Sequence, residues 1–121
     1  MTEATIFDKI INREIPATII YEDEDVLAFN DINPQAPIHF LVIPKIQIPT
    51  ANDINNDNAA LVGKLYVAAA NIADKMGFAE SGFRCVMNCN PDGGQTVYHI
   101  HLHVLAGKPL GWPPYQDTLK K

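Results

Sequence analysis

Apolar positions near the start of the chain recur with a helical period and then give way to short β-like runs. The helical stripe consists of Ile6, Phe7, Ile10 and Ile11. Its i, i+1, i+4, i+5 spacing predicts a short helix that ends before Pro16. Three runs of β-branched and aromatic residues follow and predict strands over residues 18–21, 26–29 and 38–43. Turn-forming segments separate them, which is typical of an antiparallel meander.

The second half of the chain predicts one long amphipathic helix and two more strands. The helix has apolar residues that step by three and four, at Leu61, Leu65, Ala68, Ile72 and Met76. Asn58 is a candidate cap upstream, and Gly77 stands just past the end. Residues 83–88 and 97–105 predict strands. The whole pattern indicates an α+β domain with a mostly antiparallel five-stranded sheet, one long helix and one short helix.

The last predicted strand carries three of the four histidines of the chain, at alternate positions. They are His99, His101 and His103. Because strand side chains alternate between faces, the three imidazoles are expected on one face and Ile100, Leu102 and Val104 on the other, towards a core. A polar face on such an apolar strand indicates a functional site.

Length and composition limit the kinds of protein that this chain can be. The 121 residues, 47% of them hydrophobic, predict a single domain over 1–121 that ends in a Pro-rich tail at 109–121. A net charge of -5 argues against a nucleic-acid polymer as partner. The N-terminus does not resemble a signal peptide, and no apolar run is long enough for a membrane span. We therefore expect a soluble cytoplasmic protein, also nuclear if its source is a eukaryote, with Cys85 and Cys89 reduced.

Zinc binding is one chemistry that clustered histidines can provide, because neutral imidazole is a common zinc ligand. On a strand, however, His99 and His103 would lie roughly 13 Å apart at their Cα atoms, which is too far for all three rings to share one ion. A further ligand would have to come from elsewhere, for example from His39. The triplet also contains no carboxylate to act as a base for a metal-bound water.

Covalent and acid–base chemistry by imidazole is the second interpretation. The loop at residues 92–96 contains two glycines, and its N–H groups, together with the Thr96 hydroxyl, are suited to binding an anion such as phosphate. An isolated Gly-Gly pair is ordinarily only a turn, and a single histidine on a strand is ordinarily only part of the core. Three histidines in register beside such a loop favour a site.

These residues together resemble one known family, the histidine triad (HIT) nucleotide-binding proteins, over nearly the whole chain. The signature is His-φ-His-φ-His-φ-φ, where φ is apolar, and it is present at residues 99–105. The resemblance extends to Asn88, to residues 94–97, 29–32 and 36–45, and to Trp112-Pro113-Pro114. The tail is similar to the branch that hydrolyses adenosine or guanosine 5′-phosphoramidates. A HIT-like α+β fold and this hydrolase activity are therefore implied.

The resemblance also implies roles for individual residues. His101 would be the nucleophile that attacks phosphorus and forms a nucleotidyl-histidine intermediate. His103 would contact the phosphate and help to protonate the leaving amine, while His99 and His39 would orient His101 and fix its tautomer. Asp31 would bind the ribose hydroxyls. The phosphate contacts would come from Asn88, Gly94, Gln95 and Thr96, and the apolar base slot from Ile6, Phe7, Ile10, Phe29 and Ile32.

The same resemblance implies that neither metal nor another cofactor is needed. It also implies a homodimer with joined sheets, in which Trp112 reaches towards the partner's pocket. Four positions depart from the family pattern: Asp8 replaces a cysteine of zinc-binding relatives, Gln47 replaces a histidine, Thr96 replaces a serine, and Gly111 precedes the tryptophan. Two other function classes stay open, a nucleotide-binding regulatory partner without essential catalysis and a zinc-dependent hydrolase.

Overall fold

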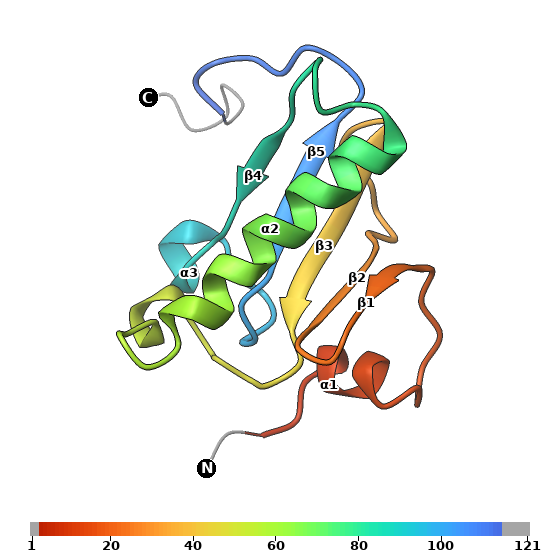
Figure 1. The fold of residues 1–121 in the computed structure, drawn as a ribbon. Coiled ribbons are helices and arrows are strands. Elements are labelled where there is room, and N and C mark those ends of the chain that lie inside the picture. The colour runs from red at the N-terminus through yellow and green to blue at the C-terminus, as the bar shows by residue number, and fades with distance from the viewer. Residues whose placement is uncertain (1–2, 115–121) are drawn as a thin grey trace.

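The computed structural model describes residues 3–114 and contains one antiparallel sheet with the strand order β1-β2-β3-β5-β4. The strands are β1 (Ile19–Glu22), β2 (Val26–Asn30), β3 (Ile38–Pro44), β4 (Arg84–Val86) and β5 (Leu102–Ala106). The long helix α2 (Ala59–Met76) lies across one face of the sheet, and the short helix α1 (Ile6–Ile11) lies at the sheet's lower end (Figure 1). The predicted α+β class and five-stranded sheet are confirmed.

The central strands are buried on both faces because each face has its own core. In β2, Val26 and Ala28 belong to the cluster under α2, whereas Leu27 and Phe29 belong to the cluster that contains Phe7 of α1. This alternation follows from the two-residue period of a strand. The sheet therefore separates two apolar clusters, a larger structural one on the α2 side and a smaller one on the α1 side.

Both predicted helices are present, with the expected ends. Thr5 caps α1 by accepting a hydrogen bond from the Phe7 N–H, and Asp8 accepts one from the Thr5 N–H, which forms a capping box. Gly77 ends α2 with a φ of 85°, a conformation that glycine adopts without steric cost. Asn58 occupies the N-cap position of α2 but makes no side-chain cap bond, since its Oδ1 accepts from the Asn55 N–H instead.

The last part of the sheet differs from the prediction at both strands. β5 begins only at Leu102, so residues 97–101 approach it as irregular chain, and β4 is shorter than the predicted 83–88. The Ile100 N–H shows why, because it donates to the Ile48 carbonyl rather than to a neighbouring strand. The residues just before this stretch form α3 (Asn90–Gly93), a single turn of helix where a plain loop was expected.

The histidines and the apolar residues between them still lie on opposite faces, as predicted, although β5 begins later than expected. Ile100, Leu102 and Val104 are fully buried in the cluster under α2. The rings of His99 and His101 contact Phe7 on the other face, with ring centroids 5.8 Å and 4.9 Å from the Phe7 ring. The imidazoles therefore gather on the α1 side of the sheet. Within residues 3–114, none of the helices has the length and apolar character needed to cross a bilayer.

Replacement of a buried residue of α2 tests the α2-side core. Leu65 is 0% exposed, so Leu65→Ala should lower the free energy of unfolding by about 2–5 kcal/mol, because the site loses apolar contacts and keeps a cavity. Met76, on the same helix, is 53% exposed, so Met76→Ala should change it by less than about 0.5 kcal/mol. Urea unfolding followed by circular dichroism measures both values. Equal effects would contradict the proposed packing of α2.

Candidate active site

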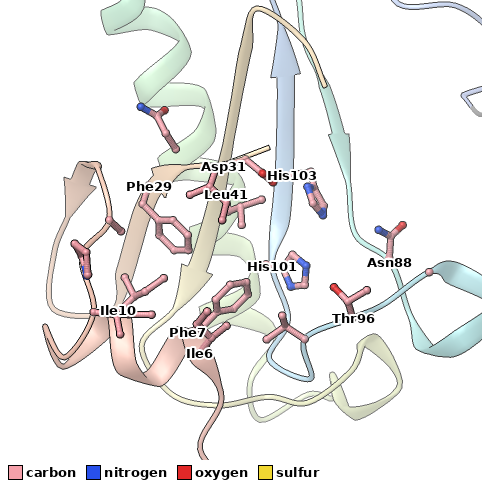
Figure 2. A pocket seen from close by; sticks show the side chains of 17 residues that line it. Ile6, Phe7, Ile10, Phe29, Asp31, Leu41, Asn88, Thr96, His101 and His103 are labelled. Carbon is pink, nitrogen blue, oxygen red and sulfur yellow. The ribbon is translucent and has the colours of Figure 1, made fainter. Parts of the chain in front are cut away.

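A cavity of about 560 Å³ opens on the α1 side of the sheet, beside the histidine run. Figure 2 shows it between α1, the strands β2 and β3, and the segment that leads into β5. Its walls are mainly apolar at the α1 end and polar at the histidine end. Seventeen residues line it: Ile6, Phe7, Ile10, Ile15, Pro16, Ala17, Phe29, Asn30, Asp31, Ile32, Leu41, Asn88, Gly94, Thr96, Val97, His101 and His103. Such a cavity is within the size range of small-ligand sites.

His101 presents one free ring nitrogen to this cavity. Its Nδ1 lies 2.8 Å from the carbonyl oxygen of His99, and a carbonyl can only accept, so Nδ1 carries the hydrogen. Neutral His101 therefore has its lone pair on Nε2, and among residues 3–114 the only hydrogen bond found for its ring is the one at Nδ1. Burial lowers the pKa of His101, and the bond to the carbonyl partly offsets this. At neutral pH the ring of His101 is therefore uncharged, with its lone pair on Nε2.

His99 lies behind the cavity rather than in its wall, and its side chain is completely buried. Its Nε2 donates to the Pro44 carbonyl at 2.7 Å, so its Nδ1 is unprotonated in the neutral ring. No hydrogen-bond partner of Nδ1 is found among the described residues, and the nearest carboxylate oxygen, on Asp8, is 3.8 Å away. The ring of His99 thus anchors the segment to β3, and it is the His99 main-chain carbonyl that orients His101.

His39 contacts His103 and not His101. The His39 Nε2 is 2.9 Å from the His103 Nδ1 and 3.4 Å from an Asp31 carboxylate oxygen. Burial, together with the neighbouring imidazoles of His101 and His39, lowers the pKa of His103 to about 4, while Asp31 acts in the opposite direction. The four histidines therefore form two pairs. In one, the His99 carbonyl accepts from the His101 ring, and in the other, the rings of His39 and His103 share a hydrogen bond.

The loop after α3 supplies the polar wall opposite the apolar slot. Asn88, Gly94 and Thr96, which are expected from the sequence to contact a phosphate, line the cavity there. Gln95 does not line it: its Oε1 accepts from the Asn90 N–H, and its Nε2 donates to the Pro49 and Val97 carbonyls at 2.7 and 3.0 Å. Because these bonds occupy the buried amide, its side chain holds the loop in place instead of facing the cavity.

The five residues predicted for the apolar slot all line the cavity. Sequence reasoning missed several others, among them Leu41 and Val97. Leu41 pairs with His103 across β3 and β5, so the strand register identifies it, but the register was not known from the sequence. Trp112 is 84% exposed and does not line the cavity, and the predicted tail continues at 115–121 outside the described residues.

Three potential metal ligands lie close together at the polar end. Asp31, His39 and His103 have ligand atoms within 4.8 Å of one another. The two imidazoles already share a hydrogen bond, however, and the His39 Nδ1 accepts from the Gln35 N–H at 3.0 Å. Neutral His39 therefore carries its hydrogen on Nε2, the atom that a metal would have to bind. The hydrogen-bond pattern does not fit a resident cation.

Comparisons with known proteins agree on one family. A model described as HIT domain matches residues 12–110. The purine nucleoside phosphoramidase of Escherichia coli K12 is 55% identical over 111 residues, which cover 92% of this chain and 93% of that protein. A 14 kDa zinc-binding protein of Zea mays is 49% identical over 91% of this chain and 87% of its own length. A crystal structure of a HIT family hydrolase from Legionella pneumophila has a TM-score of 0.90 at 49% identity, with 93% of this chain and all of that one covered.

The depressed pKa values predict how stability depends on pH. The pKa of His103 is about 4 in the folded protein against 6.5 for an ordinary imidazole, so the unfolded chain takes up this proton first as the pH falls. The free energy of unfolding should therefore decline between about pH 6.5 and pH 4. Urea titrations across this range should give a shallower decline for His103→Asn. An unchanged slope in that variant would refute the assignment.

Proposed function

Because the chain belongs to the HIT domain family, we propose that it hydrolyses purine nucleoside 5′-phosphoramidates to the nucleoside monophosphate and an amine. The observation that carries this proposal is the unprotonated Nε2 of His101, which faces a cavity with one apolar and one polar end. An apolar slot suits a purine, and the polar end suits the phosphate. The site is thus arranged for attack by a neutral imidazole on phosphorus.

In the first step, the Nε2 lone pair of His101 forms a bond to phosphorus as the phosphorus–nitrogen bond breaks. The electron pair of that bond stays on the leaving nitrogen, which needs one additional proton in order to depart as an amine. This proton enters with the substrate or reaches it through His103. His101 develops positive charge as it attacks, and the hydrogen bond from its Nδ1 to the His99 carbonyl stabilises that charge.

In the second step, water attacks phosphorus and the bond to His101 breaks. The electron pair returns to the His101 Nε2, the water oxygen becomes part of the nucleoside monophosphate, and the water protons are released to the site. Asn88, Gly94 and Thr96 would hold the phosphate oxygens through both steps, since they line the cavity beside His101. The buried side chain of Gln95 would act indirectly, by fixing the loop that carries Gly94 and Thr96.

For the nucleoside, we propose that Asp31 accepts hydrogen bonds from the ribose hydroxyls. It lies in the cavity wall, and one of its oxygens already accepts from the Asn33 N–H, which fixes the carboxylate. Ile6, Phe7, Ile10 and Phe29 would pack against the base. Ile32 is 98% exposed at the rim, so a base in the slot would cover it.

We also propose that the chain is a single domain over 1–121 that acts as a cytoplasmic homodimer. The strand β4 lies at one edge of the sheet, and an uncovered edge strand is a template for pairing with a second copy. Tyr66 and Val67 of α2 are also exposed and would offer apolar surface to a second copy. Trp112, also exposed, would extend towards the partner's pocket.

Turnover by the purified chain tests the proposed reaction. The parent protein should cleave a purine nucleoside 5′-phosphoramidate in the presence of a chelator, with release of amine and nucleoside monophosphate. His101→Ala should lower kcat by at least about 10³-fold because no other group supplies the attacking lone pair. Lys75→Ala, exposed on α2, is the matched surface control.

Binding of nucleoside monophosphate to His101→Ala should stay measurable by calorimetry, since the rest of the cavity is intact. Loss of the parent's activity with chelator would indicate a zinc-dependent hydrolase instead. Absence of turnover with intact nucleotide binding would indicate a regulatory nucleotide-binding protein.

The role of Asp31 is tested by a pair of ligands. Asp31→Asn should weaken binding of a purine ribonucleoside monophosphate about 10-fold, because a hydrogen bond to a charged group contributes about 1.5–3 kcal/mol. The 2′,3′-dideoxy analogue lacks the hydroxyls, so its Kd should be nearly the same for both proteins. Equal weakening of both ligands would show that Asp31 acts on the histidines and not on the ribose.

A further inference from the structure

The main-chain N–H of Gln35 points at a catalytic-site imidazole, although the residue itself lies on the exposed loop between β2 and β3. This N–H donates to the His39 Nδ1 at 3.0 Å. An imidazole nitrogen can accept a hydrogen bond only through its lone pair, so Nδ1 carries no hydrogen. Neutral His39 must therefore carry its hydrogen on Nε2.

The same argument fixes the position of the hydrogen on the ring of His103. The His39 Nε2 lies 2.9 Å from the His103 Nδ1, so the His39 N–H is the donor and the His103 Nδ1 is the acceptor. Neutral His103 must then carry its own hydrogen on Nε2. His103 lines the cavity beside His101, with their ring centroids 5.0 Å apart, and Figure 2 labels both rings at the polar end.

The loop that presents the Gln35 N–H is held at three points. The Asp31 carboxylate accepts from the Asn33 N–H at 2.8 Å, and the Gln35 side chain donates to the Asn33 carbonyl at 2.9 Å. At its end, Pro37 packs against Gly107, where an added Cβ would lie 2.8 Å from the Pro37 Cβ. Gly107 also has a φ of 97°, so this close approach requires glycine. The N–H donor is consequently fixed and not a chance feature of a free loop.

A second proton on His103 would have to occupy Nδ1. That hydrogen would face the His39 N–H across a gap of 2.9 Å, so the two donors would repel each other. The titratable groups that face His103 are His101, His39 and Asp31. Only Asp31 favours the charged ring, and the pKa of His103 is nevertheless lowered to about 4.

We propose that the Gln35 main-chain N–H, acting through His39, holds His103 as a neutral imidazole whose single hydrogen is directed from Nε2 at the bound phosphate. This inference rests on the proposed function for the identity of the ligand. His103 is then a hydrogen-bond donor to phosphate oxygen and does not supply the proton of the leaving group. The substrate nitrogen brings in that proton, keeps it together with the electron pair of the broken phosphorus–nitrogen bond, and leaves as the amine.

We call the two linked hydrogen bonds, from the Gln35 N–H to His39 and from His39 to His103, the relay. Nitrogen-15 NMR of the full chain tests it without any substrate. Scalar coupling across N–H···N hydrogen bonds should connect the Gln35 amide nitrogen to the His39 Nδ1, and the His39 Nε2 to the His103 Nδ1. The His103 ring should show hydrogen on Nε2 only and should remain neutral throughout the neutral pH range. Absence of these couplings, or a His103 ring with its hydrogen on Nδ1, would overturn the proposal.

A matched pair of variants separates the main-chain N–H from the side chain. Gln35→Pro removes the N–H, whereas Gln35→Ala keeps it and removes only the bond to Asn33. In Gln35→Pro the hydrogen of His103 should distribute over both nitrogens, its pKa should rise towards the ordinary value, and kcat should fall about 10-fold with a smaller change in KM, because a donor aimed at developing negative charge is partly lost. Gln35→Ala keeps the N–H, so it should change each of these three quantities much less than Gln35→Pro does.

A change in the Gln35→Ala variant as large as that in Gln35→Pro would show that the loop has only a structural role. If Gln35→Pro does not fold, His39→Phe provides the second variant, since it removes the N–H donor to His103 and leaves the loop sequence intact. It should give the same mixture of His103 tautomers, and an unchanged His103 ring would refute the relay. The NMR measurements do not depend on turnover. Intact couplings in a chain without phosphoramidase activity would therefore refute the proposed function and still support the relay.

Discussion

The hydrogen bond from the His101 Nδ1 to the His99 carbonyl is the interaction on which the site depends. It joins two residues of one irregular segment and decides which nitrogen of His101 is free to react. The segment keeps its shape because each end is anchored elsewhere: the His99 ring donates to the Pro44 carbonyl, and the Ile100 N–H donates to the Ile48 carbonyl. A regular strand would have directed the carbonyl of residue 99 to a neighbouring strand, so the interruption before β5 leaves this carbonyl free to accept from His101.

The two apolar clusters on the two faces of the sheet have different roles, one in stability and the other in the chemistry of the site. Under α2, apolar residues pack on apolar residues, and this layer can be rigid because nothing has to enter it. On the α1 side, Phe7 and Ile10 cover only part of the sheet, and the uncovered part is the cavity. The short helix therefore contributes to both functions, since Phe7 packs on Phe29 and also against the rings of His99 and His101. The same contact helps to bury the imidazoles of His99 and His101, and burial lowers their pKa.

Main-chain groups, and not carboxylates, set the tautomers of His39, His99 and His101, whereas burial is the main cause of their lowered pKa values. His101 and His99 each donate to a carbonyl, and His39 accepts from an amide. A carboxylate in those places would favour imidazolium strongly, whereas the neutral carbonyls fix the tautomers of His99 and His101 and only partly offset the effect of burial on their pKa. Among residues 3–114, Asp31 is the one carboxylate near the His39–His103 pair, and its 3.4 Å separation from the His39 Nε2 makes it the weaker partner there.

From the sequence alone, the helical stripe, the strand runs and the alternation of the histidines could be read, because periodicity reports which side of an element is buried. The residues of the apolar slot and the positions of Asn88 and Thr96 in the cavity wall also followed from the sequence, through the family resemblance. The pairing of His39 with His103, the internal bonds of Gln95 and the break before β5 did not follow. They depend on which main-chain carbonyls and amides come within about 3 Å, a matter of strand register and loop path that side-chain pattern does not encode. The sequence by itself thus determined the fold class and the chemical groups of the site, and only the tertiary structure decided where the last strand begins and which nitrogen of each histidine carries its hydrogen.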